Sequence, residues 1–429
     1  MALQKTLALS ITSLVMIAFA PNAQAANDKI IVFSDSHIEG YGNDEMRALQ
    51  NLIGDINKQR GDFDGVDLVI CTGDCVDDQS DGNLAIFKTV MDKLNVPWYA
   101  VPGNHDMKVG GESSIPCITD SESVMAAREA TWVNQTGQPV YARVDAQGNT
   151  LWEYYLVNTY RGCWNSDNNY DDVGTTQGDW LYSNVQTDYN NGKKMVFFQH
   201  YAPEDAGGIC YWGNQRADDD KYEDVLGDFS DRIEFIFNGH GHARFCSDRI
   251  EGGDIRLRMT PSLEYDEVPD CKQPVWRVKL KEDGGMATDQ ECDQGGNYDD
   301  SDDDGFSDDL DNCINVANGP LDPDAGGYSQ RDTDGDGCGN ICDPDLNSNG
   351  FTDSSDFATL EKCYQESSTD PDCDLNGNGI TDSQDVAIGK HYFDNLLPPG
   401  PSGMSASCRK DRVNPAQFLP TILEFILEF

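Results

Sequence analysis

Positive charge is scarce in this chain. Its 429 residues include 30 Lys and Arg against 76 Asp and Glu, so the formal net charge is −46. Proteins that bind nucleic acid through a basic surface need clustered Lys and Arg, so this composition excludes that class. The deficit is greatest between residues 289 and 385, which contain 27 acidic and two basic side chains. Such a density of Asp, with Asn and Gly, indicates either oxygen-ligated hard cations or a disordered acidic tail.

Long apolar segments are also scarce. After residue 25 none is long and apolar enough to span a bilayer, so we expect no membrane span in the mature chain. Residues 1–25 have the pattern of a signal peptide, with Lys5, an apolar stretch from Leu7 to Ala20, and the cleavage pattern Ala23-Gln24-Ala25. We therefore expect a secreted or periplasmic protein, with an uncleaved anchor as the alternative. All 14 cysteines follow the cleavage pattern, and an even number in an exported chain favours disulfides.

The region after the signal peptide has the pattern of an α/β domain. Apolar segments predict strands at residues 29–34, 66–72, 96–101, 152–158, 195–198, 233–237 and 275–281. Helical spacing of apolar residues at 46–58 and 84–94 places a helix between each pair of the first three strands. This βαβαβ order predicts a largely parallel sheet that is covered by helices.

Side chains that bind metals follow these strands. They are Asp35, His37, Asp74, Asn104, His200, His240 and His242. The carboxyl ends of parallel strands meet at one edge of a sheet, so we expect these side chains to lie together. Carboxylate, amide and imidazole ligands suit a pair of metal ions, and two ions about 4 Å apart clamp the oxygens of a phosphoryl displacement. The alternative is that each His is an ordinary turn residue, but of the six histidines only His391 lies outside these segments.

The order of the segments resembles that of the calcineurin-like metallophosphoesterase family. The motifs are Asp-x-His at 35–37, Gly-Asp-x-x-Asp at 73–77, Gly-Asn-His-Asp at 103–106, a lone His200, and Gly-His-x-His at 239–242. The resemblance covers residues 28–283. It implies a four-layer α/β/β/α sandwich that binds two divalent or transition-metal ions, Mn, Fe or Zn, and hydrolyses a phosphoester substrate.

The resemblance also implies a role for each residue. The metal ligands would be Asp35, His37 and His242 on one ion, Asn104, His200 and His240 on the other, and Asp74 between the two. A hydroxide shared by the two ions would attack phosphorus. His105 would protonate the leaving oxygen or stabilise the transition state, and Asp106 would set the tautomer of His105.

The substrate and the role of two cysteines stay open at this point. The form Val-Pro-Gly-Asn-His-Asp at 101–106 is more similar to the phosphodiesterase-type branch, so a phosphodiester is favoured. A phosphomonoesterase or nucleotidase is the enzymatic alternative, and a non-catalytic, calcium-dependent matrix or adhesion protein is the alternative outside catalysis. Cys71 and Cys75 flank Asp74, and we expect a disulfide or buried thiols there rather than metal ligands, because the oxygen and imidazole set is already complete.

The acidic region repeats one spacing four times. Beyond a linker at 281–291, each repeat has Asp or Asn at positions 1, 3, 5, 9 and 12 and Gly at position 6, which is the spacing of an EF-hand-type calcium loop. The oxygen-bearing residues are Asp300, Asp302, Asp304, Asp308 and Asp311; Asp332, Asp334, Asp336, Asn340 and Asp343; Asp345, Asn347, Asn349, Asp353 and Asp356; and Asp374, Asn376, Asn378, Asp382 and Asp385. Position 12 is Asp instead of the usual Glu.

These repeats resemble two kinds of calcium module. Residues 289–344, with Cys313, Cys338 and Cys342, resemble thrombospondin type 3 repeats. Residues 345–394, with expected helices at 357–364 and 386–393, resemble a dockerin-type tandem EF-hand module, which implies a protein partner. We expect Ca²⁺ in the repeats, a disordered acidic chain without it, and a front domain that folds without calcium. Residues 395–429 form a C-terminal tail, whose apolar end at 418–429 is too short to span a bilayer.

Overall fold

The computed structural model describes residues 28–79, 82–109, 122–145, 151–159, 174–203, 220–242, 246–249, 255–260, 262–263, 273–281, 284–293, 299–404 and 408. The predicted signal peptide and the tail from residue 409 lie outside the described residues. Within the described part of the chain, no helix is long and apolar enough to cross a membrane.

The first sheet has five strands around β1. Their order is β11 (Met286–Asp293), β10 (Gln273–Leu280), β1 (Asp28–Phe33), β2 (Leu68–Cys71) and β3 (Trp98–Ala100). β1, β2 and β3 are parallel, whereas β10 and β11 are antiparallel to their neighbours. Helices α1 (Asp44–Asn57) and α2 (Asn83–Met91) connect the parallel strands. The predicted βαβαβ order is confirmed.

Strand β11 corrects the prediction of a linker at residues 281–291. It pairs with β10 over its whole length, from Met286 opposite Leu280 to Asp293 opposite Gln273. Its sequence, MATDQECD, lacks the apolar run that marks a buried strand, because β11 is an edge strand and edge strands tolerate polar residues. The sheet of the front domain therefore extends beyond residue 283.

The second sheet has six strands. Their order is β4 (Ala142–Asp145), β5 (Trp152–Leu156), β6 (Lys194–Phe198), β7 (Ile233–Asn238), β9 (Arg256–Met259) and β8 (Cys246–Arg249). The four central strands are parallel, and β4 and β8 are antiparallel at the edges. Helices α4 (Gly174–Asn190) and α5 (Asp220–Asp228) belong to this half of the domain.

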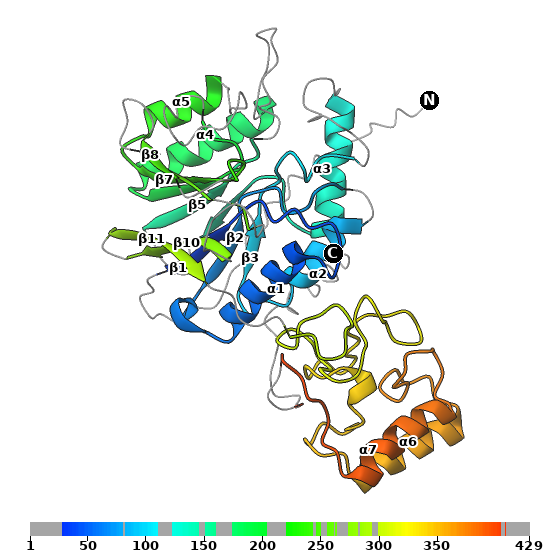
Figure 1. Cartoon of the computed structure of the whole chain (residues 1–429). Coiled ribbons are helices and arrows are strands. Elements are labelled where there is room, and N and C mark those ends of the chain that lie inside the picture. The colour runs from blue at the N-terminus through cyan, green and yellow to red at the C-terminus, as the bar shows by residue number, and fades with distance from the viewer. Residues whose placement is uncertain are drawn as a thin grey trace, which may run out of the picture.

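Successive side chains of β1 pack alternately into two apolar cores. Ile30 and Val32 belong to the cluster between the two sheets, together with Phe198 and Phe237. The residues between and after them, Ile31 and Phe33, belong to the cluster under α1 and α2. The helices thus lie outside two facing sheets, with α3 (Glu122–Thr136) beside α2 (Figure 1).

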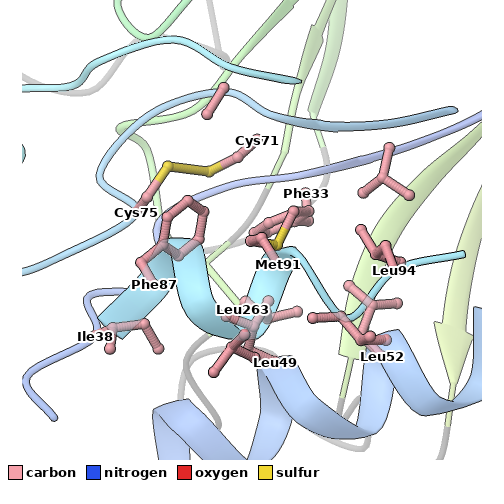
Figure 2. Close-up of a cluster of buried hydrophobic side chains, with 14 of the residues drawn as sticks. Phe33, Ile38, Leu49, Leu52, Cys71, Cys75, Phe87, Met91, Leu94 and Leu263 are labelled. Carbon is pink, nitrogen blue, oxygen red and sulfur yellow. A yellow bond between two sulfur atoms is a disulfide. The ribbon is translucent and has the colours of Figure 1, made fainter. Parts of the chain in front are cut away.

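The cluster under α1 and α2 contains a disulfide between Cys71 and Cys75 (Figure 2). Both cysteines are fully buried beside Phe33 and Phe87. Of the roles expected for these cysteines, the structure shows the disulfide.

The C-terminal module consists of the described residues 299–404 and 408, and it lies next to α1 and α2 (Figure 1). It contains a short 3-10 helix (Asn340–Cys342) and the helices α6 (Ser354–Glu366) and α7 (Ser383–Asn395), which pack together. A capping box of Asp353 and Asp356 begins α6, and one of Asp382 and Asp385 begins α7, so positions 9 and 12 of the last two acidic loops start these helices. Disulfides join Cys313 to Cys342, Cys338 to Cys408, and Cys363 to Cys373.

Candidate metal centre

The seven predicted metal ligands meet at the carboxyl ends of strands from both sheets. The ligand atoms of one group lie within 4.8 Å of one another, and they belong to Asp35, His37, Asp74 and His242. A second group on the same criterion consists of Asp74, His200 and His240. Asn104 Oδ1 lies 3.1 Å from His200 Nε2 and so joins the second group. Asp74 is common to both groups, which is the position that a bridging ligand requires.

The backbone at this centre is strained. Five of the seven residues have positive φ: Asp35 (52°), His37 (42°), Asp74 (50°), His240 (67°) and His242 (44°). For a residue with a Cβ this conformation costs on the order of 1 kcal/mol, and it persists where other contacts impose it. The Asp35 N–H donates to Gly73 O at 2.9 Å, and the His37 N–H donates to Asp74 O at 3.1 Å. These bonds between adjacent strand ends hold both segments in place.

Two glycines allow the strand ends to approach one another. Gly73 has a φ of +98°, and a Cβ there would lie 2.5 Å from the His200 ring. A Cβ on Gly103 would lie 2.3 Å from Asp74 Oδ1. Both distances are well below van der Waals contact, so any larger residue would displace a predicted ligand.

His200 and Asp74 form a buried ion pair. His200 Nδ1 lies 3.0 Å from Thr72 O, so a proton donated there directs Nε2 toward Asp74 Oδ2, 3.1 Å away. Burial disfavours a charged His200, but the negative charge of Asp74 outweighs it and raises the pKa of His200 to about 9. Burial would likewise raise the pKa of Asp74, but His200 holds it well below its usual range. A cation bound here would replace the proton that this pair holds.

The remaining donors fit metal ions. His240 Nδ1 is buried and has no hydrogen-bond partner among the described residues. Burial, with the nearby charge of His200, lowers the pKa of His240 to about 4, and burial also lowers the pKa of His37. Neutral imidazoles with available lone pairs are metal ligands, and this mixture of imidazole and carboxylate suits zinc, iron and manganese. That these residues bind metal stays a prediction.

His105 lies beside the centre and is partly exposed. Its backbone N–H donates to Asp74 Oδ1 at 2.7 Å. Its ring lies 4.5 Å from the His37 ring, centroid to centroid, and 29% of its side chain is exposed. His105 can therefore contact a substrate bound over the two ligand groups.

Asp106 does not orient His105, so that part of the prediction is wrong. The Asp106 carboxylate accepts hydrogen bonds from the N–H groups of Gly103 at 2.7 Å and Val76 at 2.9 Å, and the residue is fully buried. Burial, with the charge of Asp74, raises the pKa of Asp106 to about 7. The residue beside the ring is Asp77, whose Oδ1 lies 2.8 Å from His105 Nδ1. Its signal was present in the sequence as the last position of Gly-Asp-x-x-Asp.

The four acidic loops share one backbone geometry. In each loop the carboxylate at position 1 accepts a hydrogen bond from the N–H of the glycine at position 6. These pairs are Asp300 and Gly305, Asp332 and Gly337, Asp345 and Gly350, and Asp374 and Gly379. The four glycines have φ values of 97°, 94°, 88° and 92°. Sequence spacing therefore corresponds to a repeated fold of the loop.

Several carboxylate oxygens in these loops are buried and have no hydrogen-bond partner among the residues that the structure describes. They are both side-chain oxygens of Asp302, Oδ2 of Asp336 and Oδ1 of Asp374. Burial, with the charge of Asp336, raises the pKa of Asp343 to about 8. Burial, with the charge of Asp304, raises the pKa of Asp302 to about 7. The loops thus concentrate negative charge that nothing within them neutralises.

Comparison with known proteins places this arrangement in a family. The sequence pattern of the family described as calcineurin-like phosphoesterase matches residues 28–244, which include all seven predicted ligands and His105. The 3′,5′-cyclic adenosine monophosphate phosphodiesterase CpdA of Haemophilus influenzae is 23% identical over 268 residues, covering 60% of this chain and 85% of that protein. A probable glycerophosphodiester phosphodiesterase GpdQ of Arcobacter nitrofigilis is 37% identical over 83 residues, covering 18% of this chain and 29% of that protein.

A dimetal phosphatase from Danio rerio aligns with a TM-score of 0.43 and 14% identity, covering 61% of this chain and 95% of that one. The family pattern covers half of the chain, and the residues it includes form the two ligand groups described above. The chain therefore belongs to the calcineurin-like phosphoesterase family and is a metal-dependent phosphoester hydrolase.

Proposed function

We propose that this protein hydrolyses phosphodiester bonds at a dinuclear centre whose shared ligand is Asp74. The observation that carries the proposal is the membership of Asp74 in both ligand groups. One divalent ion in each group would supply Lewis-acid charge to the phosphoryl oxygens and to the attacking water.

Protein side chains position and supply the proton for the leaving oxygen. Asp77 accepts a hydrogen bond from His105 Nδ1, which orients the ring. The other ring nitrogen, Nε2, then donates a proton to the leaving oxygen. Asp106 holds the turn that carries His105, through its bonds to the N–H groups of Gly103 and Val76.

The sequence favours a phosphodiester over a phosphomonoester. The form Val-Pro-Gly-Asn-His-Asp at 101–106 is more similar to the phosphodiesterase-type branch of the family. The names of the curated relatives CpdA and GpdQ, both phosphodiesterases, point in the same direction.

A diester and a monoester that have the same leaving group test this proposal. Manganese-loaded protein is assayed with bis(4-nitrophenyl) phosphate and with 4-nitrophenyl phosphate, and kcat/KM is compared. We expect the diester to be preferred by at least about tenfold, which corresponds to about 1.4 kcal/mol of transition-state stabilisation. Asp74→Asn, purified in parallel, controls for contaminating phosphatases. Equal rates, or a preference for the monoester, would instead identify a phosphomonoesterase.

We also propose that the chain is exported and that each acidic loop binds one calcium ion. The signal-peptide pattern and the disulfides of the described residues support export, because disulfides persist in oxidising compartments. The common loop geometry and the unpaired buried oxygens support calcium. Mass spectrometry of the exported protein should find Ala26 at its N-terminus, and equilibrium dialysis should find four calcium ions.

A protein partner is proposed for the last two loops. Phe351 and Ile380 occupy position 7 of their loops, and they are 65% and 58% exposed. Pull-down of a partner by the full chain, lost when both residues are changed to Ser, would support this proposal.

A further inference from the structure

The first acidic loop, residues 300–311, packs into the core of the domain that contains both sheets, residues 28–293. This domain, the front domain of the sequence analysis, is the catalytic domain. Phe306 and Leu310 are fully buried and belong to the cluster that contains Leu49 and Leu52 of α1. The Phe306 ring lies 5.7 Å from the Tyr41 ring, centroid to centroid. The loop therefore completes a core whose other members come from the catalytic domain.

The buried side chain of Gln50, on α1, makes two hydrogen bonds with the backbone of the loop. Gln50 Nε2 donates to Gly305 O at 3.0 Å, and Gln50 Oε1 accepts from the Ser307 N–H at 2.7 Å. These two bonds bracket Phe306. They can form only while the loop keeps the turn at Gly305, so the loop conformation and the packing on α1 depend on each other.

Scarce positive charges gather at the same contact. Lys58 Nζ and Arg60 both pair with Asp309, the latter at 2.7 Å. Lys93 Nζ lies 4.7 Å from the Phe306 ring centroid and donates to Gln330 Oε1 at 3.0 Å. In a chain with 30 basic and 76 acidic residues, these three cations add ion pairs and a cation–π contact to the apolar packing of the loop.

We infer that the cation proposed for loop 300–311 is a structural cation of the catalytic domain. The inference rests on the calcium binding proposed above. The ligand atoms of Asp300, Asp302 and Asp304 lie within 4.8 Å of one another, and within the described part of the chain both buried Asp302 oxygens have no hydrogen-bond partner. Without a cation their repulsion opens the loop, and the core loses Phe306 and Leu310. With the cation the loop holds both residues in place.

This proposed coupling is the alternative to the prediction that the front domain folds without calcium. The contacts place the cation of the first loop in the folding equilibrium of both parts of the chain, because a ligand that binds the folded form stabilises every element that unfolds with the site. The fourth loop, 374–385, offers a matched comparison, since it has the same spacing and lies in the module that carries α6 and α7.

Tryptophan fluorescence separates the two parts within the full-length protein. All seven tryptophans precede residue 277, so their signal reports on the catalytic domain alone. Thermal unfolding is followed by this signal on calcium-depleted protein, before and after calcium is added. We expect calcium to raise the midpoint by about 5 °C or more at a hundredfold excess over its dissociation constant. Asp300→Asn should abolish the shift, and Asp374→Asn, the same change at position 1 of the fourth loop, should retain it.

Calcium stoichiometry is measured on the same samples. If no calcium binds, the proposed calcium sites fail and the inference fails with them. If calcium binds but the midpoint of the natural protein stays unchanged, the inference alone is overturned. An equal shift in both variants would place the stabilising ion elsewhere, such as the catalytic centre, and would also overturn it. If Asp300→Asn does not fold, Gln50→Leu is the second variant, because it keeps every ligand of the loop. It should bind as much calcium as the natural protein but show a smaller rise in the unfolding midpoint. An undiminished rise would contradict the inference.

Discussion

His105 Nδ1 and Asp77 Oδ1 lie 2.8 Å apart, and the ring nitrogen is also 3.0 Å from the Asp77 carbonyl oxygen. Asp77 is itself held, because Lys108 Nζ donates to its Oδ2 at 3.3 Å. The carboxylate fixes the orientation of the ring and keeps a proton on Nδ1. His105 therefore acts with Asp77 as a unit.

Replacing Asp77 should impair turnover without removing metal. Asp77→Asn keeps the shape of the side chain but weakens its hold on the His105 proton, so we expect kcat to fall about tenfold to a hundredfold. Asp78→Asn, one residue further on, should leave kcat unchanged. Loss of metal from Asp77→Asn would mean that this carboxylate is a ligand.

Removing the His105 ring should slow the reaction according to the leaving group. We expect His105→Ala to retain its metal and to lose about 10²–10⁴ in kcat with a poor leaving group, which is the usual contribution of a positioned acid. With 4-nitrophenolate, which leaves without protonation, the loss should be smaller. Rates for a series of aryl diesters measure this dependence. A uniform loss across the series would show that His105 does not donate the proton.

The close contact at Gly103 predicts a sensitive position. A Cβ there would meet Asp74 Oδ1 at 2.3 Å, so Gly103→Ala should push Asp74 away and weaken metal binding. Gly227→Ala is the control, because nothing lies within 4 Å of a Cβ at that helical position. The control should be stable, or gain about 0.5–1 kcal/mol, from the helix propensity of Ala. Metal titration of both variants checks the contrast, which normal affinity in Gly103→Ala would refute.

Calcium binding to the acidic loops should release protons in a pH-dependent manner. Burial and neighbouring carboxylates raise the pKa of Asp343 to about 8 and that of Asp302 to about 7, above the value of about 3.9 expected in the unfolded chain. The calcium-free fold therefore binds more protons than the unfolded chain, and it loses stability as the pH rises from about 4 to 8. Calcium displaces those protons, so a titration at pH 6 in weak buffer should acidify the solution, and one at pH 9 should hardly do so. Absence of release at pH 6 would contradict the shifted pKa values.

Much of the catalytic domain could be predicted from its sequence. Strands β1, β2 and β7 are mainly apolar and are followed by predicted ligands, and parallel strands bring such ends together. Helix α3 was not predicted, because its segment, Glu122–Thr136, includes few apolar residues at helical spacing. Strand β11 was misread as a linker because an edge strand does not need an apolar face.

Two contacts depend on tertiary geometry that sequence spacing does not encode. Asp106 adjoins His105 in the chain, yet the side chain beside the ring is that of Asp77, 28 residues earlier. Gln50 binds Gly305 across 255 residues, so nothing local to the first acidic loop shows that Phe306 is buried against α1. Motif order indicated which residues gather, whereas their partners could be assigned only from the fold.

The metal content of Asp74→Asn tests the central claim most directly, because Asp74 alone belongs to both ligand groups of the described centre. Manganese, iron and zinc are counted per chain in the natural protein and in the variant, with calcium counted separately for the acidic loops. The account predicts two such ions in the natural protein, and loss of one or both ions together with activity in Asp74→Asn. A variant that retains two ions and normal turnover would contradict the claim that Asp74 joins two metals in the active centre.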